Sequence, residues 1–130
     1  MITMLYAGLC TLLILALAGR VIAGRWRHKV GLGDGGNSEL SRLVRAHANA
    51  VEYVPLALIL LGGMELNGYA DGLVHAFGAT LFASRLLHAW GLATSGGTST
   101  GRFLGTVLTL LLMIAMSVMA ILGFVAGQAG

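Results

Sequence analysis

Long apolar runs alternate with short glycine-rich and polar segments along the chain, and this pattern predicts four membrane-spanning helices. The apolar runs cover about residues 2–23, 38–66, 71–92 and 100–126. About 20 helical residues cross the roughly 30 Å hydrocarbon layer, so each run is long enough to span it. Backbone groups in lipid must bond internally, which favours helices over strands. We therefore predict an all-α integral membrane protein with one four-helix bundle over residues 1–130.

The short segments between the apolar runs carry turn and capping residues. Segments 31–36, 67–69 and 95–98 are rich in glycine and polar residues, so we expect turns there. Pro55 lies inside the second helix, where it removes one backbone bond and is expected to bend the helix slightly. The candidate helix caps are Asn37 or Ser38, Asp71, and Ser99 or Thr100.

Small residues recur at four-residue spacing in the first and fourth helices, which would allow close approach of a neighbouring helix. Glycine and alanine are also common in membrane helices, so the spacing alone leaves both interpretations open. The pairs are Gly19 and Ala23, Gly101 and Gly105, and Gly123 and Gly127.

The composition supports a membrane protein and excludes several other classes. Hydrophobic residues make up 57% of the chain and charged residues only 10%, whereas a soluble domain carries about 25% charged residues. The one cysteine excludes a disulfide framework and a thiolate zinc site. That cysteine, Cys10, is expected to be a buried apolar residue. The histidines lack tight ligand spacing, so we predict no metal.

The net charge of +3 indicates how the protein is oriented in the membrane. All basic residues fall at or near one side of the predicted bundle, and the positive-inside rule places that side in the cytoplasm. The first and third connections are then cytoplasmic and both termini lie outside. We find no aromatic-basic pattern that indicates nucleic-acid binding. The basic residues are Arg20, Arg25, Arg27, Lys29, Arg42, Arg45, Arg85 and Arg102.

Polar and charged side chains cluster on one face of the second predicted helix. At about 100° per residue they share a face roughly 100° wide, and His47 lies on the other side. An ionisable residue at mid-membrane costs about 2.5–3.5 kcal/mol, so the cluster needs a reason. One interpretation is a structural ion-pair network, and another is a groove for a ligand with carboxylates and an ammonium group. The face comprises Arg42, Arg45, Asn49, Glu52 and Tyr53.

The third and fourth helices add further cations. Arg85 and His88 are three residues apart and share one side of the third helix. Arg85 lies deep enough to need a partner, and Glu52 is the nearest plausible acid. We expect Arg42 and Arg85 to act in structural ion pairs. Arg102 lies in the first turn of the fourth helix, where the helix dipole slightly disfavours a cation. It is therefore either a basic residue that follows the positive-inside rule at the cytoplasmic end of the helix, or a functional residue.

The segment from Arg42 to Pro55 contains the run Arg-Ala-His-x-Asn-x-x-Glu and resembles the second-helix signature of the MAPEG family, the membrane-associated proteins in eicosanoid and glutathione metabolism. The resemblance covers the whole chain and includes the Arg85-x-x-His88 pair and the basic residue that opens the fourth helix. The combined pattern is most similar to a small bacterial member. It implies a homotrimer in the bacterial inner membrane, with glutathione bound between neighbouring protomers and open to the cytoplasm.

The same resemblance implies roles for individual residues. Arg102 would be the catalytic residue that stabilises the glutathione thiolate, and Arg85 would be a structural partner. His47 would face the neighbouring protomer. The residues implied to bind glutathione are Arg25, Arg45, His47, Asn49, Glu52, Tyr53 and His88.

The chain also departs from the family pattern. Leu92 stands where several family enzymes carry a tyrosine, Trp26 replaces an arginine, and Phe103 replaces the serine of one branch. These departures weaken the case for prostaglandin or leukotriene synthesis. They leave glutathione conjugation or glutathione-dependent peroxide reduction on lipophilic substrates as the expected reactions.

Two other functions compete with a glutathione-dependent enzyme. One is a non-catalytic protein that binds glutathione or membrane lipid. The other is a small four-helix exporter of cationic drugs, since such exporters have a similar length. They usually rely on an acid in the first helix, and residues 2–23 contain none.

Overall fold

The computed structural model describes residues 1–94 and 99–128 and is all-helical in that part of the chain. Its helices are α1 (Ile2–His28), α2 (Ser38–Leu66), α3 (Asp71–Thr94) and α4 (Thr100–Gln128). α1 continues five residues beyond its apolar run because Arg25, Arg27 and His28 extend the helix as a basic last turn. It ends at Lys29, which adopts the left-handed conformation with φ 55°. The predicted turn at 95–98 lies outside the described residues.

Side-chain caps fix the start of two helices. The Asn37 side chain accepts a hydrogen bond from the backbone N–H three residues later at 2.9 Å and caps α2. Ser99 caps α4 in the same way at 3.3 Å. Asp71 is the first residue of α3 and not its cap, because the carbonyl of Ala70 accepts the first backbone bonds. α2 continues through Pro55 without a break.

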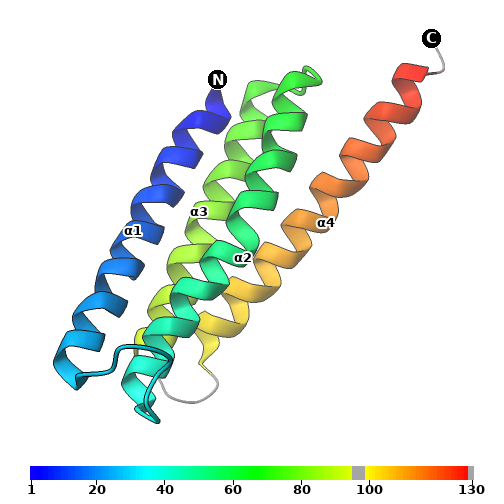
Figure 1. Ribbon diagram of the computed structural model, residues 1–130. Coiled ribbons are helices and arrows are strands. Elements are labelled where there is room, and N and C mark those ends of the chain that lie inside the picture. Colours follow the sequence, from blue (N-terminus) through cyan, green and yellow to red (C-terminus); the bar gives the residue numbers. More distant parts are fainter. Residues whose placement is uncertain (95–98, 129–130) are drawn as a thin grey trace.

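The helices form an open arrangement in which α1 and α4 lie at opposite edges (Figure 1). α2 and α3 lie between them, and α1 and α4 do not touch within residues 1–94 and 99–128. Both termini lie at one end, and the α1–α2 loop lies at the other. We call this second end the basic end, since it carries Arg25, Arg27, Lys29 and Arg42. The protein is therefore less closed than the compact bundle that the sequence predicts.

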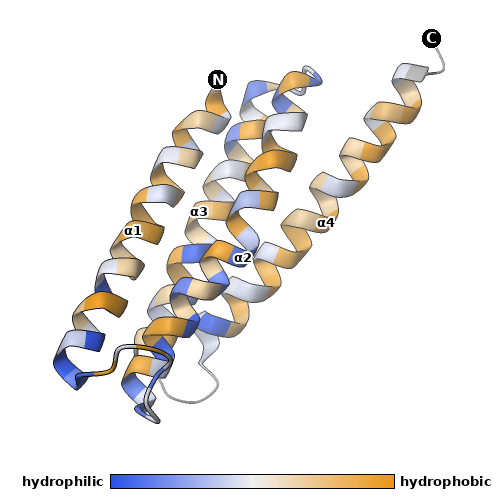
Figure 2. Cartoon of the chain, in the orientation of Figure 1, coloured by the Kyte–Doolittle hydropathy of each residue, from blue (hydrophilic) through white to orange (hydrophobic). Residues whose placement is uncertain are grey.

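Apolar side chains cover most of the outer surface, and hydrophilic positions gather toward the basic end (Figure 2). Three described helices, α1, α2 and α4, are long and apolar enough to span a membrane. α3 runs alongside them but is less apolar, because it carries His75, Arg85 and His88. Large exposed apolar residues occur along α4, as expected for contact with lipid. They include Phe103, Leu104, Leu111, Ile114, Ile121 and Phe124.

The closest helix contact is between α3 and α4, at one of the small-residue pairs. A methyl group on Gly105 would lie 2.6 Å from the Ser84 carbonyl oxygen and 2.7 Å from the His88 backbone nitrogen. A methyl group on Gly101 would lie 3.1 Å from a carbonyl oxygen of α3. The other two pairs each contain a glycine that faces open space. These glycines are Gly19 and Gly127.

A second close contact joins α1 to α3 in the half far from the basic end. The ring of Tyr6 lies directly against Gly78, and its hydroxyl is 3.0 Å from Nδ1 of His75. We expect Gly78→Ala to displace this ring and break the hydrogen bond, which would cost about 1 kcal/mol of stability. Thermal unfolding in detergent measures the loss. Gly72→Ala is the matched control, because Gly72 of α3 faces open space, and equal unfolding temperatures would contradict the prediction.

Candidate functional site

A cavity of about 440 Å³ lies between α2, α3 and α4 in the half of the protein nearest the basic end. Its walls are mostly polar, although the helices around it are apolar on their outer faces. The lining residues are Ser38, Ser41, Arg42, Arg45 and Asn49 of α2, His88 and Leu92 of α3, and Arg102 and Thr106 of α4.

The electrostatic character of this cavity is positive. Three arginines, Arg42, Arg45 and Arg102, line it together with His88, and no carboxylate is among the lining residues. Charged groups in a recess with low-dielectric walls focus the local field. Arginine also binds carboxylates in a bidentate manner. The cavity is therefore suited to an anionic ligand, above all one with carboxylate groups.

Arg85 lies behind the cavity and joins three helices. Its side chain is only 2% exposed. Nη1 donates to Oδ1 of Asn49 at 2.7 Å, and Nη2 donates to the Gly105 carbonyl oxygen at 3.1 Å. The guanidinium also lies 5.7 Å from the centre of the Tyr53 ring, in a cation-π contact. The sequence predicted the carboxylate of Glu52 as the partner of Arg85. In the structure Arg85 instead contacts the Asn49 amide, the Gly105 carbonyl and the Tyr53 ring.

Glu52 lies outside the cavity, on an exposed face of α2. It is the middle residue of the helix Ser38–Leu66. Glu52 forms no salt bridge with a described residue. Asn49 and Tyr53 of the same helix are the residues that contact Arg85. An exposed acid in a membrane-spanning helix is costly when it faces lipid.

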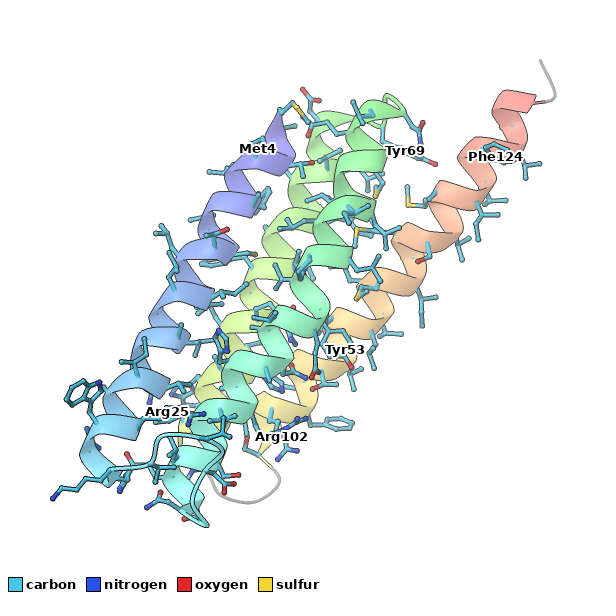
Figure 3. All side chains as sticks on the ribbon, in the orientation of Figure 1. Met4, Arg25, Tyr53, Tyr69, Arg102 and Phe124 are labelled. Carbon is cyan, nitrogen blue, oxygen red and sulfur yellow. The ribbon has the colours of Figure 1, made fainter. Side chains whose placement is uncertain are left out.

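His88 and Leu92 form the α3 wall of the cavity. They are 4% and 6% exposed and lie one helical turn apart. Figure 3 shows Arg102 at the start of α4 and Arg25 near the end of α1, and these two helices lie at opposite edges of the protein. The polar residues predicted on three helices are therefore partly brought together and partly separated.

Arg25 and His47 are the predicted glutathione-binding residues that lie farthest from this arrangement. Arg25 lines a separate hollow of about 370 Å³ with Trp26 and Lys29. Its Nη1 atom is buried and finds no hydrogen-bond partner among residues 1–94 and 99–128. His47 is half-buried and does not line the cavity. Neither residue therefore lines the cavity between α2, α3 and α4.

Several lining residues were not predicted, although the spacing could have revealed them. Ser38 is four residues before Arg42, Ser41 is four residues before Arg45, and Thr106 is four residues after Arg102. These pairs share helix faces, and all of these hydroxyl residues line the cavity. Helical spacing from each arginine would have identified these three residues. Their hydroxyl groups add neutral hydrogen-bonding groups to the cavity wall.

Asp34, in the loop at the basic end, lies close to Ser41, one of these hydroxyl residues. Asp34 accepts a hydrogen bond from the backbone N–H of Gly36 at 3.0 Å. This bond, together with a weaker one from the Ser41 hydroxyl, holds the pKa of Asp34 below its usual value. Asp34 is therefore ionised at neutral pH near Ser41, which lines the cavity.

The family comparison accounts for this combination of helices and polar residues. The MAPEG family model matches residues 3–122, which is nearly the whole chain. The chain belongs to the MAPEG family and is an integral membrane protein. It is 44% identical over 91 residues to the inner membrane protein YecN of Escherichia coli strain K12, covering 70% of each chain. YecN of Escherichia coli O6:H1 strain CFT073 shows the same identity and coverage. The name of these relatives gives a location in the inner membrane and no reaction.

Proposed function

We propose that this protein is a glutathione-dependent membrane enzyme, a transferase or peroxidase that acts on lipophilic electrophiles. The observation that carries the proposal is the cavity between α2, α3 and α4, which brings Arg42, Arg45 and Arg102 together with no carboxylate among its lining residues. Such a site within an otherwise apolar membrane protein favours a small, water-soluble anion as one substrate.

Glutathione has the groups that this site would recognise. Its two carboxylates can accept paired hydrogen bonds from guanidinium groups such as those of Arg42 and Arg45. Asn49 and His88 supply neutral polar groups deeper in the cavity. Its ammonium group needs an acceptor, and Glu52, which lies on α2 one turn beyond Asn49 and outside the cavity, is the acid that we assign to it. The tripeptide would therefore lie along α2, with its ammonium end toward the exposed side of that helix.

Arg102 is the residue that we assign to the chemical step. A free thiol has a pKa near 8.5, so only a few per cent is thiolate at neutral pH. An adjacent guanidinium lowers such a pKa by about 1–3 units. Arg102 lines the cavity from the first turn of α4, where it would act as a fixed positive charge beside the sulfur.

Two reactions follow from a bound thiolate. In conjugation, the sulfur attacks an electrophilic carbon, a C–S bond forms, and the displaced group leaves with its electron pair. In peroxide reduction, the sulfur attacks one oxygen of the O–O bond and releases the alcohol. A second glutathione then attacks the sulfur that now carries this oxygen, displaces water and forms glutathione disulfide. Apolar substrates would reach the site from the bilayer, along the exposed apolar surface of α4.

We also propose that a neighbouring protomer in a homotrimer completes the site, which would face the cytoplasm. The exposed carboxylate of Glu52 at the middle of α2 supports this, because a charge facing lipid costs about 2.5–3.5 kcal/mol. Arg25 and His47 lie outside the protomer's own cavity. In an assembly they would be supplied to the cavity of an adjacent copy.

Glu52→Gln separates the two roles available to this carboxylate. If Glu52 binds the ammonium of glutathione, the substitution should weaken binding by roughly tenfold, the size of one hydrogen bond between charged groups. If it neutralises an arginine of another copy, the oligomer should dissociate. Glutathione titration and the mass of the detergent-solubilised complex distinguish these results. Unchanged affinity together with an unchanged mass would exclude both roles.

A non-catalytic protein that binds glutathione or lipid is the second candidate. Leu92 favours it, because this apolar side chain occupies the cavity wall beside His88 where several family enzymes are expected to carry a tyrosine hydroxyl. Such a protein would hold glutathione in the same cavity without activating its thiol.

Direct titration of the purified, detergent-solubilised protein with glutathione tests the proposal. Turnover is then measured with a panel of lipophilic halides, epoxides and hydroperoxides. Binding with turnover supports the enzyme, and binding without turnover supports the second candidate. Failure to bind glutathione would contradict both.

A further inference from the structure

The geometry around Arg85 points to a role that goes beyond its bonds between helices. We propose that Arg85 is a positioning residue that turns the side-chain amide of Asn49, so that the amide N–H groups face the cavity as donors to the ligand. This inference rests on the proposed function, because the ligand that would accept from these donors is glutathione.

The orientation of the amide follows from the chemistry of the two side chains. A guanidinium group has only hydrogen-bond donors. The Asn49 atom that lies 2.7 Å from Nη1 of Arg85 must therefore be the amide oxygen Oδ1. The Nδ2 group of Asn49, with its two N–H donors, does not take part in this bond and can donate to another group. Because Asn49 lines the cavity, those donors are available to a carboxylate or carbonyl oxygen of a bound ligand.

Arg85 can impose this orientation because it is itself fixed. It is 2% exposed, its Nη2 is bonded to the Gly105 carbonyl oxygen at 3.1 Å, and its guanidinium lies over the Tyr53 ring. A rotated Asn49 amide would point Nδ2 at Nη1 and place two donors together. With Arg85 in place, the side-chain amide of Asn49 therefore has only one orientation in which it can accept the hydrogen bond from Arg85.

The same guanidinium also fixes the position of one turn of α2 relative to one turn of α4. Gly105 lies one turn beyond Arg102 on α4, and Asn49 lies one turn beyond Arg45 on α2. One side chain bonded to both Gly105 and Asn49 holds these two turns level with each other. The ligand groups contacted by Asn49 and by Arg102 would consequently be held at a fixed separation.

A double-mutant cycle on glutathione affinity tests the proposal. Arg85→Lys keeps the positive charge but loses the planar fork that bonds two partners at once. We expect Arg85→Lys to weaken glutathione binding by roughly tenfold in the wild-type background. In an Asn49→Ala background the same substitution should have no further effect, because Arg85 acts through Asn49. An equal loss in both backgrounds would show a general structural role and overturn the proposal.

Asn49→Asp is the matched control. Its carboxylate still accepts from Arg85, so the unfolding temperature should be at least that of the wild-type protein. The N–H donors are lost, so glutathione affinity should fall at least as far as in Asn49→Ala. Wild-type affinity in Asn49→Asp would overturn the inference while leaving the proposed function intact. If the wild-type protein itself fails to bind glutathione, the proposed function fails, and the cycle measured by unfolding temperature still tests the bond between Arg85 and Asn49.

Discussion

Replacing Arg102 with alanine is expected to reduce turnover by roughly 10- to 30-fold at pH 7. The reason is the loss of the positive charge that would lower the thiol pKa by about 1–3 units. Without it the bound thiol returns to a pKa near 8.5, and only a few per cent is thiolate at neutral pH. Glutathione affinity should change by a few-fold at most, since Arg42 and Arg45 still line the cavity.

The pH dependence makes this prediction specific. The lowered thiol pKa increases the thiolate fraction only below about pH 8.5, so the difference between Arg102→Ala and the wild-type protein should shrink as the pH rises above this value. Arg102→Lys is the control, because it keeps a positive charge at the same position. Turnover of Arg102→Ala equal to that of the wild-type protein, or a deficit that is the same at every pH, would remove Arg102 from the proposed mechanism.

Gly105→Ala should destabilise the protein by about 1–3 kcal/mol, the usual cost of an added group in a closely packed contact. The new methyl group would lie 2.6 Å from the Ser84 carbonyl oxygen, 2.7 Å from the His88 nitrogen and 2.8 Å from the His88 Cβ. Two of these atoms belong to the backbone of α3, so they cannot move aside as a flexible side chain can. α4 must shift outward, and the arginine of its first turn moves with it.

Thermal unfolding in detergent and glutathione titration measure the two consequences of Gly105→Ala. Gly127→Ala is the control on the same helix, because Gly127 faces open space. It should keep or slightly raise the unfolding temperature, since alanine favours the helix over glycine. If Gly105→Ala and Gly127→Ala unfold at the same temperature, the close approach of α3 and α4 is not a source of stability.

The number of helices and their approximate bounds followed from the sequence because apolar runs of this length have few alternatives in a membrane. The ends were less predictable, since hydropathy does not say where a helix stops. α1 continued through a charged turn to His28 because left-handed Lys29, and not the last apolar residue, ends it. The open arrangement was not predictable either. It depends on which apolar faces pack together, and the hydropathy pattern of each helix does not give those pairings.

Helical spacing placed Arg42, Arg45 and Asn49 on one face of α2, and these three residues line the cavity, whereas Glu52 and Tyr53 of the same predicted face do not. Spacing within one helix could not give the partner of Arg85, because that partner depends on the register between helices. An uncharged amide and a backbone carbonyl accept hydrogen bonds from its two terminal nitrogens, and a backbone carbonyl leaves no mark in a sequence. The roles of Arg25 and His47 stay predictions, because neither residue lies at the cavity of its own protomer.

The tight packing of α3 against α4 also has a consequence for motion. Gly91, Gly101 and Gly105 bring these two helices into backbone contact, and the Ser84 and Thr109 hydroxyls bond across them at 2.9 Å. The pair should therefore move as one rigid body. Any change in the width of the cavity is then expected to come from α2, together with the α1 helix packed against it, shifting relative to this pair.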